Sequence, residues 1–536
     1  MNKLYYGDNL TIMQRMTKHS VDLIYLDPPF NSQQNYNLLY KTMTGKPVPE
    51  QAEAFCDTWE MDTQKDEIAR NMPVLMREYG VEDYYVKFWD LWMKALRHTQ
   101  PHLLAYLIYM VQRLLHMKVI LRPTGSIYLH CDPTASHYIK VMMDGIFGHR
   151  NFRNEIIWKR TSAHSSAKRY GPVHDVILFY AASDAMKWVG GHQKYDADYV
   201  KQRFARGDER PWKDADITGS GVRHGETGNA WRGFDVTAKG RHWAYPPSEL
   251  DRMDAEGLVY WPKRAGGWPR MKKYLDETKG VPLQDVWTDI SPINSQARER
   301  LGYPTQKPIA LLSRIIESSS EPGDVVFDPF CGCGTTIYAA EQLGRNWVGC
   351  DIAILAVKLI RELLAERYRL IEGVHFVLDG IPVTVEQAEE LFRRDPFQFQ
   401  HWAVERAGGF PMTKKGADHG IDGRMYFEAG KTLKEMVLSV KGGAIRPTDV
   451  RDLRGVLERE DGAEMAGFIS LREPSRAMRE EAATAGMLKY GGIDYPRIQF
   501  LTIGDMLEEK REFHTPSKVG TRISTGQTSL LPANAL

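Results

Sequence analysis

The sequence has few cysteines, no uninterrupted apolar stretch of membrane length and almost no net charge. Five cysteines in 536 residues, without paired spacing over a small domain, argue against a disulfide framework and favour a reducing cytoplasm. The most apolar long window, residues 103–121, is interrupted by polar residues including Arg113 and Lys118. It therefore predicts a buried helix, and the amino-terminus lacks the apolar run of a signal peptide. We expect a cytoplasmic protein that does not contact a membrane.

The charge balance excludes global attraction to a polyanion. The chain has 70 Lys and Arg against 69 Asp and Glu, so affinity for nucleic acid must come from local patches. At 536 residues it is long enough for roughly two to four domains, each able to bury a core of its own.

An acidic Pro-Pro stretch, Asp27-Pro28-Pro29-Phe30, follows the alternating run 21–26. The run predicts a buried strand, and the prolines end it, so the acid and the ring lie at its carboxyl end. There Asp27 and the Pro28 carbonyl can accept both hydrogens of an exocyclic amine, with Phe30 stacked on the ring that carries it. A plain turn with a capping Asp and a core Phe fits the tetrapeptide equally well.

A second strand exit has the features of a cofactor site. Asp328 begins the glycine-bearing loop 328–336, which follows a predicted strand and opens a helix, and Asp351 ends the next strand about 20 residues later, the spacing of a ribose-binding acid. A carboxylate beside the ligand repels pyrophosphate and favours sulfonium or ammonium, which fits S-adenosylmethionine and not NAD. Cys331 and Cys333 lack the second ligand pair of a zinc site.

These stretches together resemble the amino-methyltransferases of DNA, in the β group whose catalytic half precedes the cofactor half. The resemblance covers residues 1 to about 184 and 300 to about 370, and its motifs are Gly7-Asp8-Asn9-Leu10, Asp27-Pro28-Pro29-Phe30, Thr305-Gln306-Lys307-Pro308 and the loop 328–336. It implies transfer of a methyl group from S-adenosylmethionine to a base amine in double-stranded DNA. The aspartate form of the second motif goes with adenine, whereas serine is commoner for cytosine; methylation of a cytosine amine stays an alternative.

The resemblance also assigns roles to individual residues. The target base is held by Asp27, Pro28, Pro29 and Phe30. The predicted cofactor-binding residues, with Asp8 at the adenine end and Asp351 at the ribose, are Asp8, Lys307, Asp328, Phe330, Gly332, Gly334, Thr335 and Asp351. No metal is expected in this site.

The predicted fold is α/β: a Rossmann-like methyltransferase sheet with an irregular insert and a second α/β domain. The expected divisions are a catalytic half (1–184), a target recognition region (185–298), a cofactor-binding half (299–375) and a nuclease-like domain (376–536). Seven tryptophans lie among short charged runs between residues 185 and 298. Such aromatics can stack on bases, although any one of them can equally be core.

The last domain resembles the restriction endonucleases that cut modified DNA. The resemblance implies that Glu405 and Asp422 ligate Mg²⁺ and that Lys441 orients water, but Ser439 stands where a carboxylate or amide is expected. Two interpretations follow: a fused restriction and modification enzyme whose last domain cuts, or a nuclease-derived module that binds DNA or stabilises the enzyme. A homodimer and a separate restriction subunit are further expected partners that the sequence leaves open. A protein that only reads DNA would need neither the Asp27 nor the Asp328 loop.

Overall fold

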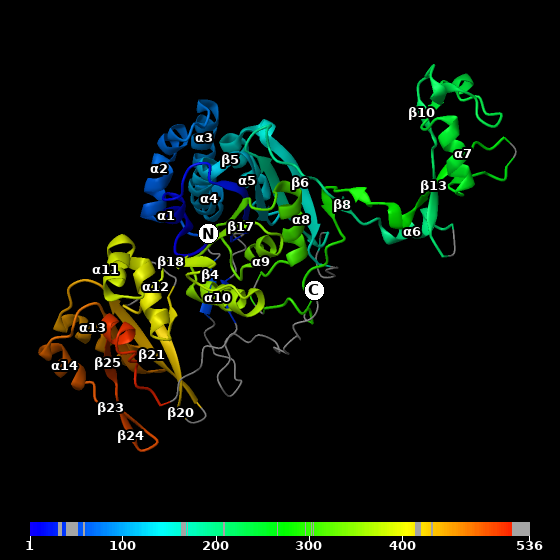
Figure 1. Cartoon of the computed structure of the whole chain (residues 1–536). Helices are drawn as coiled ribbons and strands as arrows, with labels where there is room; N and C mark the ends of the chain where they lie inside the picture. Colours follow the sequence, from blue (N-terminus) through cyan, green and yellow to red (C-terminus); the bar gives the residue numbers. More distant parts are fainter. Residues whose placement is uncertain are drawn as a thin grey trace. The chain divides into compact units, whose positions relative to one another are not determined.

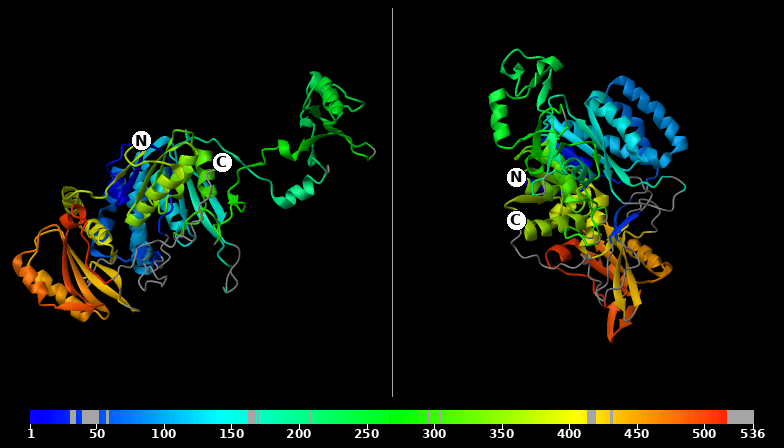
Figure 2. Two further views of the ribbon diagram at one scale, coloured as in Figure 1. Left: turned by 60° about the horizontal axis from the view of Figure 1, so that its bottom comes forward. Right: turned by 90° about the vertical axis from the view of Figure 1, so that its right-hand side faces the viewer.

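The computed structural model describes residues 1–29, 35–38, 52–56, 59–161, 168, 170–206, 209–264, 266–294, 296–301, 303, 305–412, 420–429 and 432–516. The chain forms two compact units (Figures 1 and 2). One comprises Met1–Val189 together with Asp285–Leu536, and the other is Gly190–Gln284. The smaller unit lies inside the range 185–298 that the sequence predicts as the target recognition region.

A mixed sheet forms the centre of the larger unit. Its strands run parallel except β7, which is antiparallel to both neighbours. In the described part of the chain nine strands pair in this spatial order: β15 (Val286–Trp287), β6 (Phe152–Lys159), β7 (His174–Ala181), β5 (Leu121–Cys131), β2 (Val21–Leu26), β16 (Val325–Asp328), β17 (Asn346–Asp351), β1 (Asn2–Tyr6) and β18 (Phe376–Asp379). Residues far apart in sequence thereby become neighbours, with β2 beside β16.

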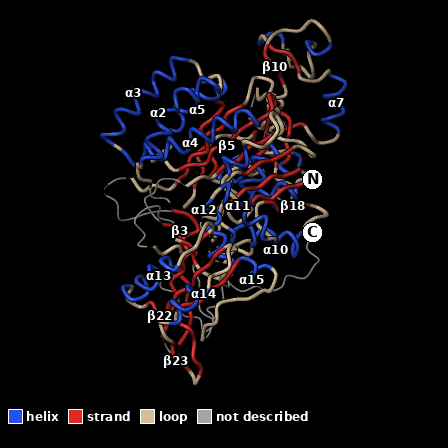
Figure 3. The backbone as a smooth tube through the Cα atoms, turned by 90° about the vertical axis from the view of Figure 1, so that its left-hand side faces the viewer, coloured by secondary structure: helices blue, strands red, loops and turns tan. Residues whose placement is uncertain are grey.

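Helices cover both faces of this sheet, which explains why β2 is buried along its whole length. Leu23 and Tyr25 belong to one core cluster, whereas Ile24 and Leu26 belong to another, as alternation along a strand requires. One face packs against α2 (Thr63–Glu78), α3 (Asp83–Thr99), α4 (Pro101–Ile120) and α5 (Ser136–Met143), gathered together in Figure 3. The other packs against α8 (Ile309–Ser319), α9 (Thr335–Gln342) and α10 (Ile354–Tyr368).

The apolar window 103–121 is helix α4, as predicted. Among the described residues it is the one helix long and apolar enough to cross a membrane, and 72% of that window is buried inside the protein. Its packing in the core accounts for the apolar composition. Helices α3 and α4 are divided before Pro101, whose ring ends the preceding helix.

The smaller unit, Gly190–Gln284, contains short elements around a small tryptophan core. Trp231 and Trp243 are buried there with Ile217 and Leu250, whereas Trp261 is exposed at its rim. Its described elements include α6 (Ala197–Arg203), β9 (Trp212–Ala215), β10 (Thr218–Ser220), β11 (Arg241–Trp243), α7 (Pro247–Ala255), β12 (Val259–Tyr260) and β13 (Arg270–Tyr274).

The carboxyl-terminal segment builds a second, mixed sheet. Its strand order is β19 (Phe410–Pro411), β20 (Gly423–Ala429), β21 (Thr432–Lys441), β22 (Ala463–Ser470) and β25 (Ile498–Thr502). The helices of this segment are α11 (Val385–Arg394), α12 (Pro396–Arg406), α13 (Pro447–Arg459), α14 (Arg476–Ala483) and α15 (Ile503–Leu507). Residues of α12 share a core cluster with the large sheet, so the two sheets belong to one compact unit.

Candidate functional site

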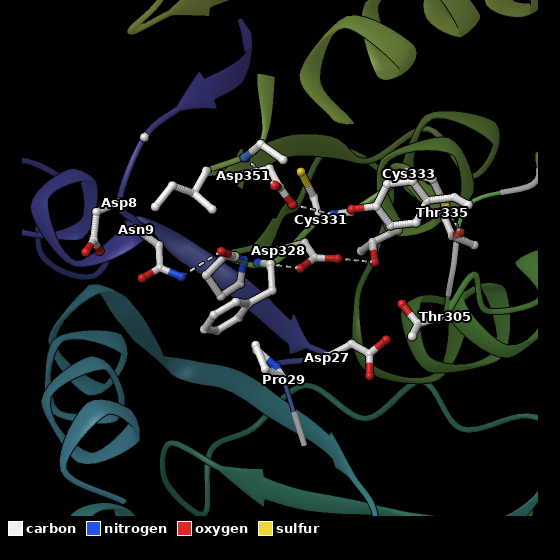
Figure 4. A pocket seen from close by; sticks show the side chains of 18 of the residues that line it. Asp8, Asn9, Asp27, Pro29, Thr305, Asp328, Cys331, Cys333, Thr335 and Asp351 are labelled. Atoms are coloured by element: carbon white, nitrogen blue, oxygen red, sulfur yellow. Dashed lines mark hydrogen bonds between the residues drawn. The ribbon is translucent and has the colours of Figure 1, made fainter. Parts of the chain in front are cut away.

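Four neighbouring parallel strands end at one cavity of about 320 Å³. In the order β2, β16, β17, β1 their carboxyl ends bear Asp27, Asp328, Asp351 and Asp8, and all four acids line the cavity (Figure 4). Ligands of open α/β sheets bind at this edge. The sheet order therefore brings together the two halves of the site that lie 300 residues apart in the sequence.

Within the described part of the chain, one oxygen of Asp27 is paired and the other is not. Lys307 Nζ forms an ion pair with its Oδ2, and the same ammonium lies 3.3 Å from the Thr305 carbonyl oxygen. The buried Oδ1 of Asp27 has no hydrogen-bond partner among the described residues. Pro29 lines the cavity and Pro28 is buried, whereas Phe30 lies outside the described residues.

Asp328 anchors the loop that opens helix α9. Its Oδ1 accepts from the Phe330 backbone N–H at 3.0 Å and its Oδ2 from the Thr336 hydroxyl. Burial raises the pKa of Asp328 to about 7, with the charges of Asp27 and Asp351 adding to the rise. A buried acid of this kind is held ionised most easily by a cationic ligand.

Asp351 couples the same loop to the next strand. Its Oδ2 accepts from the Gly332 N–H at 2.8 Å and its Oδ1 from the Ala353 N–H at 2.9 Å. Burial raises its pKa to about 6, although these backbone donors act in the opposite direction. Gly334 caps α9 at φ +86°, where a Cβ would lie 2.7 Å from Ile360 Cγ1, so this turn requires glycine.

Asp8 is held by a residue that the sequence reasoning missed. Arg113 of α4 donates to both Asp8 oxygens at 2.8 and 3.0 Å and to Asn9 Oδ1. Asn9 in turn donates to the Pro329 carbonyl at 2.8 Å and so connects this corner to the Asp328 loop. In the sequence, Arg113 only interrupts an apolar window. The one sign of its role there is that a cation stands inside a helix predicted to be buried.

A buried polar chain lies next to this edge. Tyr25, which lines the cavity, bonds His130 Nδ1 at 2.9 Å, and His130 Nε2 lies 3.1 Å from Asp175. Cys131, the sequence neighbour of His130, is buried in the other core, so the two side chains point to opposite faces of β5. His130 therefore contacts Tyr25 and Asp175, and the Cys131 thiol lies on the other side of the strand.

Cys331 and Cys333 are buried small residues of the Asp328 loop. Burial raises the pKa of the Cys333 thiol to about 11, which keeps it protonated. Within the described ranges there is no group of three or more His, Cys, Asp or Glu side chains arranged to hold a metal ion.

Of the three residues predicted for a nuclease centre, Glu405 lies apart from Asp422. Glu405 lines the cavity at the sheet edge, whereas Asp422 accepts hydrogen bonds from Gln400, Ser439 and the Val440 N–H. Gln400 and Glu405 both lie on α12, five residues and therefore about 140° apart around its axis. Lys441 ends β21, the strand that also carries Ser439. Gln400, and not Glu405, is the α12 residue beside Asp422.

With this geometry in view, the comparisons identify the class of protein. The family described as DNA methylase matches residues 21–362, and the chain belongs to it. The chain is 36% identical over 263 residues to the type II methyltransferase M.EcaI of Enterobacter cloacae, a match covering 49% of this chain and 58% of that protein. It is 27% identical over 373 residues to the StyLTI Mod subunit, a type III restriction-modification enzyme of Salmonella typhimurium, covering 66% and 52%. The matches thus span little more than half the length of these relatives.

Solved structures of DNA methyltransferases are more distant. The PvuII DNA methyltransferase, described as cytosine-N4-specific, is 12% identical, with a TM-score of 0.32 and coverage of 70% of this chain and 88% of that one. The M1.HpyAVI complex with S-adenosylmethionine is 16% identical, with a TM-score of 0.29 and coverage of 68% and 99%.

Proposed function

We propose that this protein transfers a methyl group from S-adenosylmethionine to the exocyclic amine of adenine at a specific site in double-stranded DNA, as the modifying part of a restriction-modification system. The observation that carries the proposal is the buried Oδ1 of Asp27, which has no hydrogen-bond partner among the described residues and lies at the cavity that Asp328 and Asp351 also line. An amine donor would satisfy that oxygen. Membership of the DNA methylase family supports the reaction class.

The side chains that line the cavity fit S-adenosylmethionine. Carboxylates line the cavity from Asp27 to Asp8, and its volume of about 320 Å³ is that of a small-molecule site. When bound, the cofactor supplies a methyl group on a sulfonium. Asp328 complements that cation and its ammonium, while Asp351 and Asp8 offer acceptors to the hydroxyls and amine of the nucleoside.

The residues of this chain would promote methyl transfer by positioning the target amine. Once the base is swung out of the helix, Asp27 Oδ1 and the Pro28 carbonyl accept the two amine hydrogens and direct the nitrogen lone pair at the methyl group. The nitrogen would gain the methyl group as the bond between that group and the cofactor's sulfur breaks, leaving a neutral thioether, and would lose one proton toward Asp27; no covalent enzyme intermediate is required. Lys307 orients Asp27 by holding its other oxygen.

Sequencing of single DNA molecules from cells that express the chain tests the proposal. We expect N6-methyladenine at one short sequence, absent from cells that express Asp27→Ala. N4-methylcytosine in its place would overturn the choice of adenine, and unmodified DNA would overturn the activity.

A further inference from the structure

Helix α12 of the carboxyl-terminal segment is fastened to the methyltransferase sheet. Gln398 Nε2 donates to the Tyr6 carbonyl oxygen at 3.2 Å in a buried contact, at the end of β1. Phe399, Trp402 and Val404 belong to the same core cluster as Tyr6. Figure 1 shows α12 in yellow. This helix is therefore part of the packing around the sheet edge.

One face of α12 reaches the cavity. Phe397, His401 and Glu405 are spaced by four residues, so they share a face of the helix, and all three line the cavity with Asp351 and Ile352. The Phe397 and His401 rings lie 4.3 Å apart between centroids. A wall made by a segment outside the family match of 21–362 thus completes the cavity.

The wall stands at the end of the cavity away from Asp27. Along the sheet edge the strand order is β2, β16, β17, β1. Helix α12 is hydrogen-bonded to the end of β1 through Gln398, and Glu405 interacts electrostatically with Asp351 at the end of β17. Under the proposed function, the methyl group lies toward Asp27 and the nucleoside toward Asp351 and Asp8. The α12 face would therefore meet the nucleoside.

One carboxyl oxygen of Glu405, Oε2, is buried and has no hydrogen-bond partner among the described residues. Burial raises the pKa of Glu405 to about 8 and the charge of Asp351 adds to the rise, whereas Lys358 and the backbone N–H of Ile354, the first residue of α10, lower it. The buried Oε2 calls for a donor from the cavity.

We propose that the α12 face of Phe397, His401 and Glu405 is the outer wall of the nucleoside subsite, and that Glu405 Oε2 accepts a hydrogen bond from a nucleoside donor, a ribose hydroxyl or the adenine amine. The inference rests on the proposed function. It makes the carboxyl-terminal domain a part of the cofactor site.

Calorimetric titration of the full-length protein tests the assignment with two probes, S-adenosylmethionine and methylthioadenosine, which keeps the nucleoside and lacks the amino-acid part. Glu405→Gln retains an acceptor for the Ile354 N–H and places an amide NH₂ where the free oxygen was. We expect it to weaken binding of both probes about tenfold, the effect of one lost hydrogen bond. Glu390→Gln, the same charge change at an exposed position of α11, should bind both probes within twofold of wild type.

Phe397→Ala provides a second variant on a half-buried position of the same face, and it should weaken methylthioadenosine binding several-fold. If circular dichroism shows that Glu405→Gln is unfolded, the affinity of Phe397→Ala decides the test. Wild-type affinity of folded Glu405→Gln, or of Phe397→Ala in its place, would overturn the inference. A protein that binds S-adenosylmethionine with this dependence but methylates no DNA would overturn the proposed function alone, and one that binds neither probe would overturn both.

Discussion

The cavity at the sheet edge and the surroundings of Asp422 both contain partly buried acids, but they satisfy them differently. At the cavity, Asp27 and Glu405 each keep a buried oxygen without a partner among the described residues. Asp422, by contrast, accepts from Gln400, Ser439 and the Val440 N–H. A buried acceptor without a donor costs free energy unless a ligand supplies one. The unpartnered oxygens mark the cavity as a site arranged for a ligand, whereas Asp422 is an acid whose hydrogen bonds its own domain already supplies.

The largest effect expected from this comparison is that of Asp27→Ala. Loss of the free acceptor removes the group that orients the amine, so methyl transfer to DNA should fall roughly 100-fold, as for other lost catalytic hydrogen bonds. Affinity for S-adenosylmethionine, measured by calorimetry, should stay within twofold of wild type. A variant that retains more than a tenth of the wild-type rate of labelled methyl transfer would contradict the role of Asp27.

Asp328→Asn should weaken S-adenosylmethionine binding about tenfold. The substitution removes a charge that complements the sulfonium while leaving an oxygen to accept from the Phe330 N–H or Thr336. Asp452→Asn, an exposed position of α13, is the matched control and should bind like wild type. Equal affinities of Asp328→Asn and Asp452→Asn for S-adenosylmethionine would show that Asp328 shapes the loop and that its charge does not contribute to binding.

The acids of the cavity predict a pH dependence of stability. The pKa values of Asp328, Asp351 and Glu405 are raised to about 7, 6 and 8, whereas unfolded carboxyls titrate near about 4. From pH 4 upward the folded protein therefore binds more protons than the unfolded chain, and its free energy of unfolding falls as the pH rises toward 8. We expect a loss of several kcal/mol, at most about 8, between pH 5 and 8 for the unliganded protein.

Thermal unfolding across this pH range measures that loss. Asp328→Asn cannot titrate at this position, so its stability should fall less steeply between pH 5 and 8. Saturating S-adenosylmethionine should also reduce the slope, because the cation favours the ionised carboxylates. A wild-type protein that gains stability over the same range would show that these acids are ionised in the unliganded fold.

Asp422→Asn should have the smallest effect on the proposed reaction. It weakens the hydrogen bonds with Gln400, Ser439 and Val440, which should lower the free energy of unfolding by about 1–3 kcal/mol. Methyl transfer and cofactor affinity should stay within twofold of wild type. Supercoiled DNA, methylated or not, should remain intact with Mg²⁺. Cutting by wild type that Asp422→Asn or Lys441→Ala abolishes would instead support the fused restriction and modification enzyme.

Much of the fold could be predicted from sequence patterns, because strands and turns depend on residues close together in the sequence. Alternation over 21–26, the prolines that follow it and the glycine loop after Asp328 placed three acids at strand ends, and the structure has β2, β16 and β17 ending at those acids. The family match supports the class of reaction that these motifs predicted. The residue roles and the domain boundaries remain predictions.

The sequence by itself determined which residues end strands, because periodicity and turn chemistry act over a few positions. Only the tertiary structure decided their partners: Lys307 against Asp27, Arg113 against Asp8, and Glu405 at the cavity and not beside Asp422. These pairings depend on the order β2, β16, β17, β1 and on which side of α12 faces the large sheet. Contacts over more than 100 residues follow from such packing, which the spacing of residues along the chain does not specify.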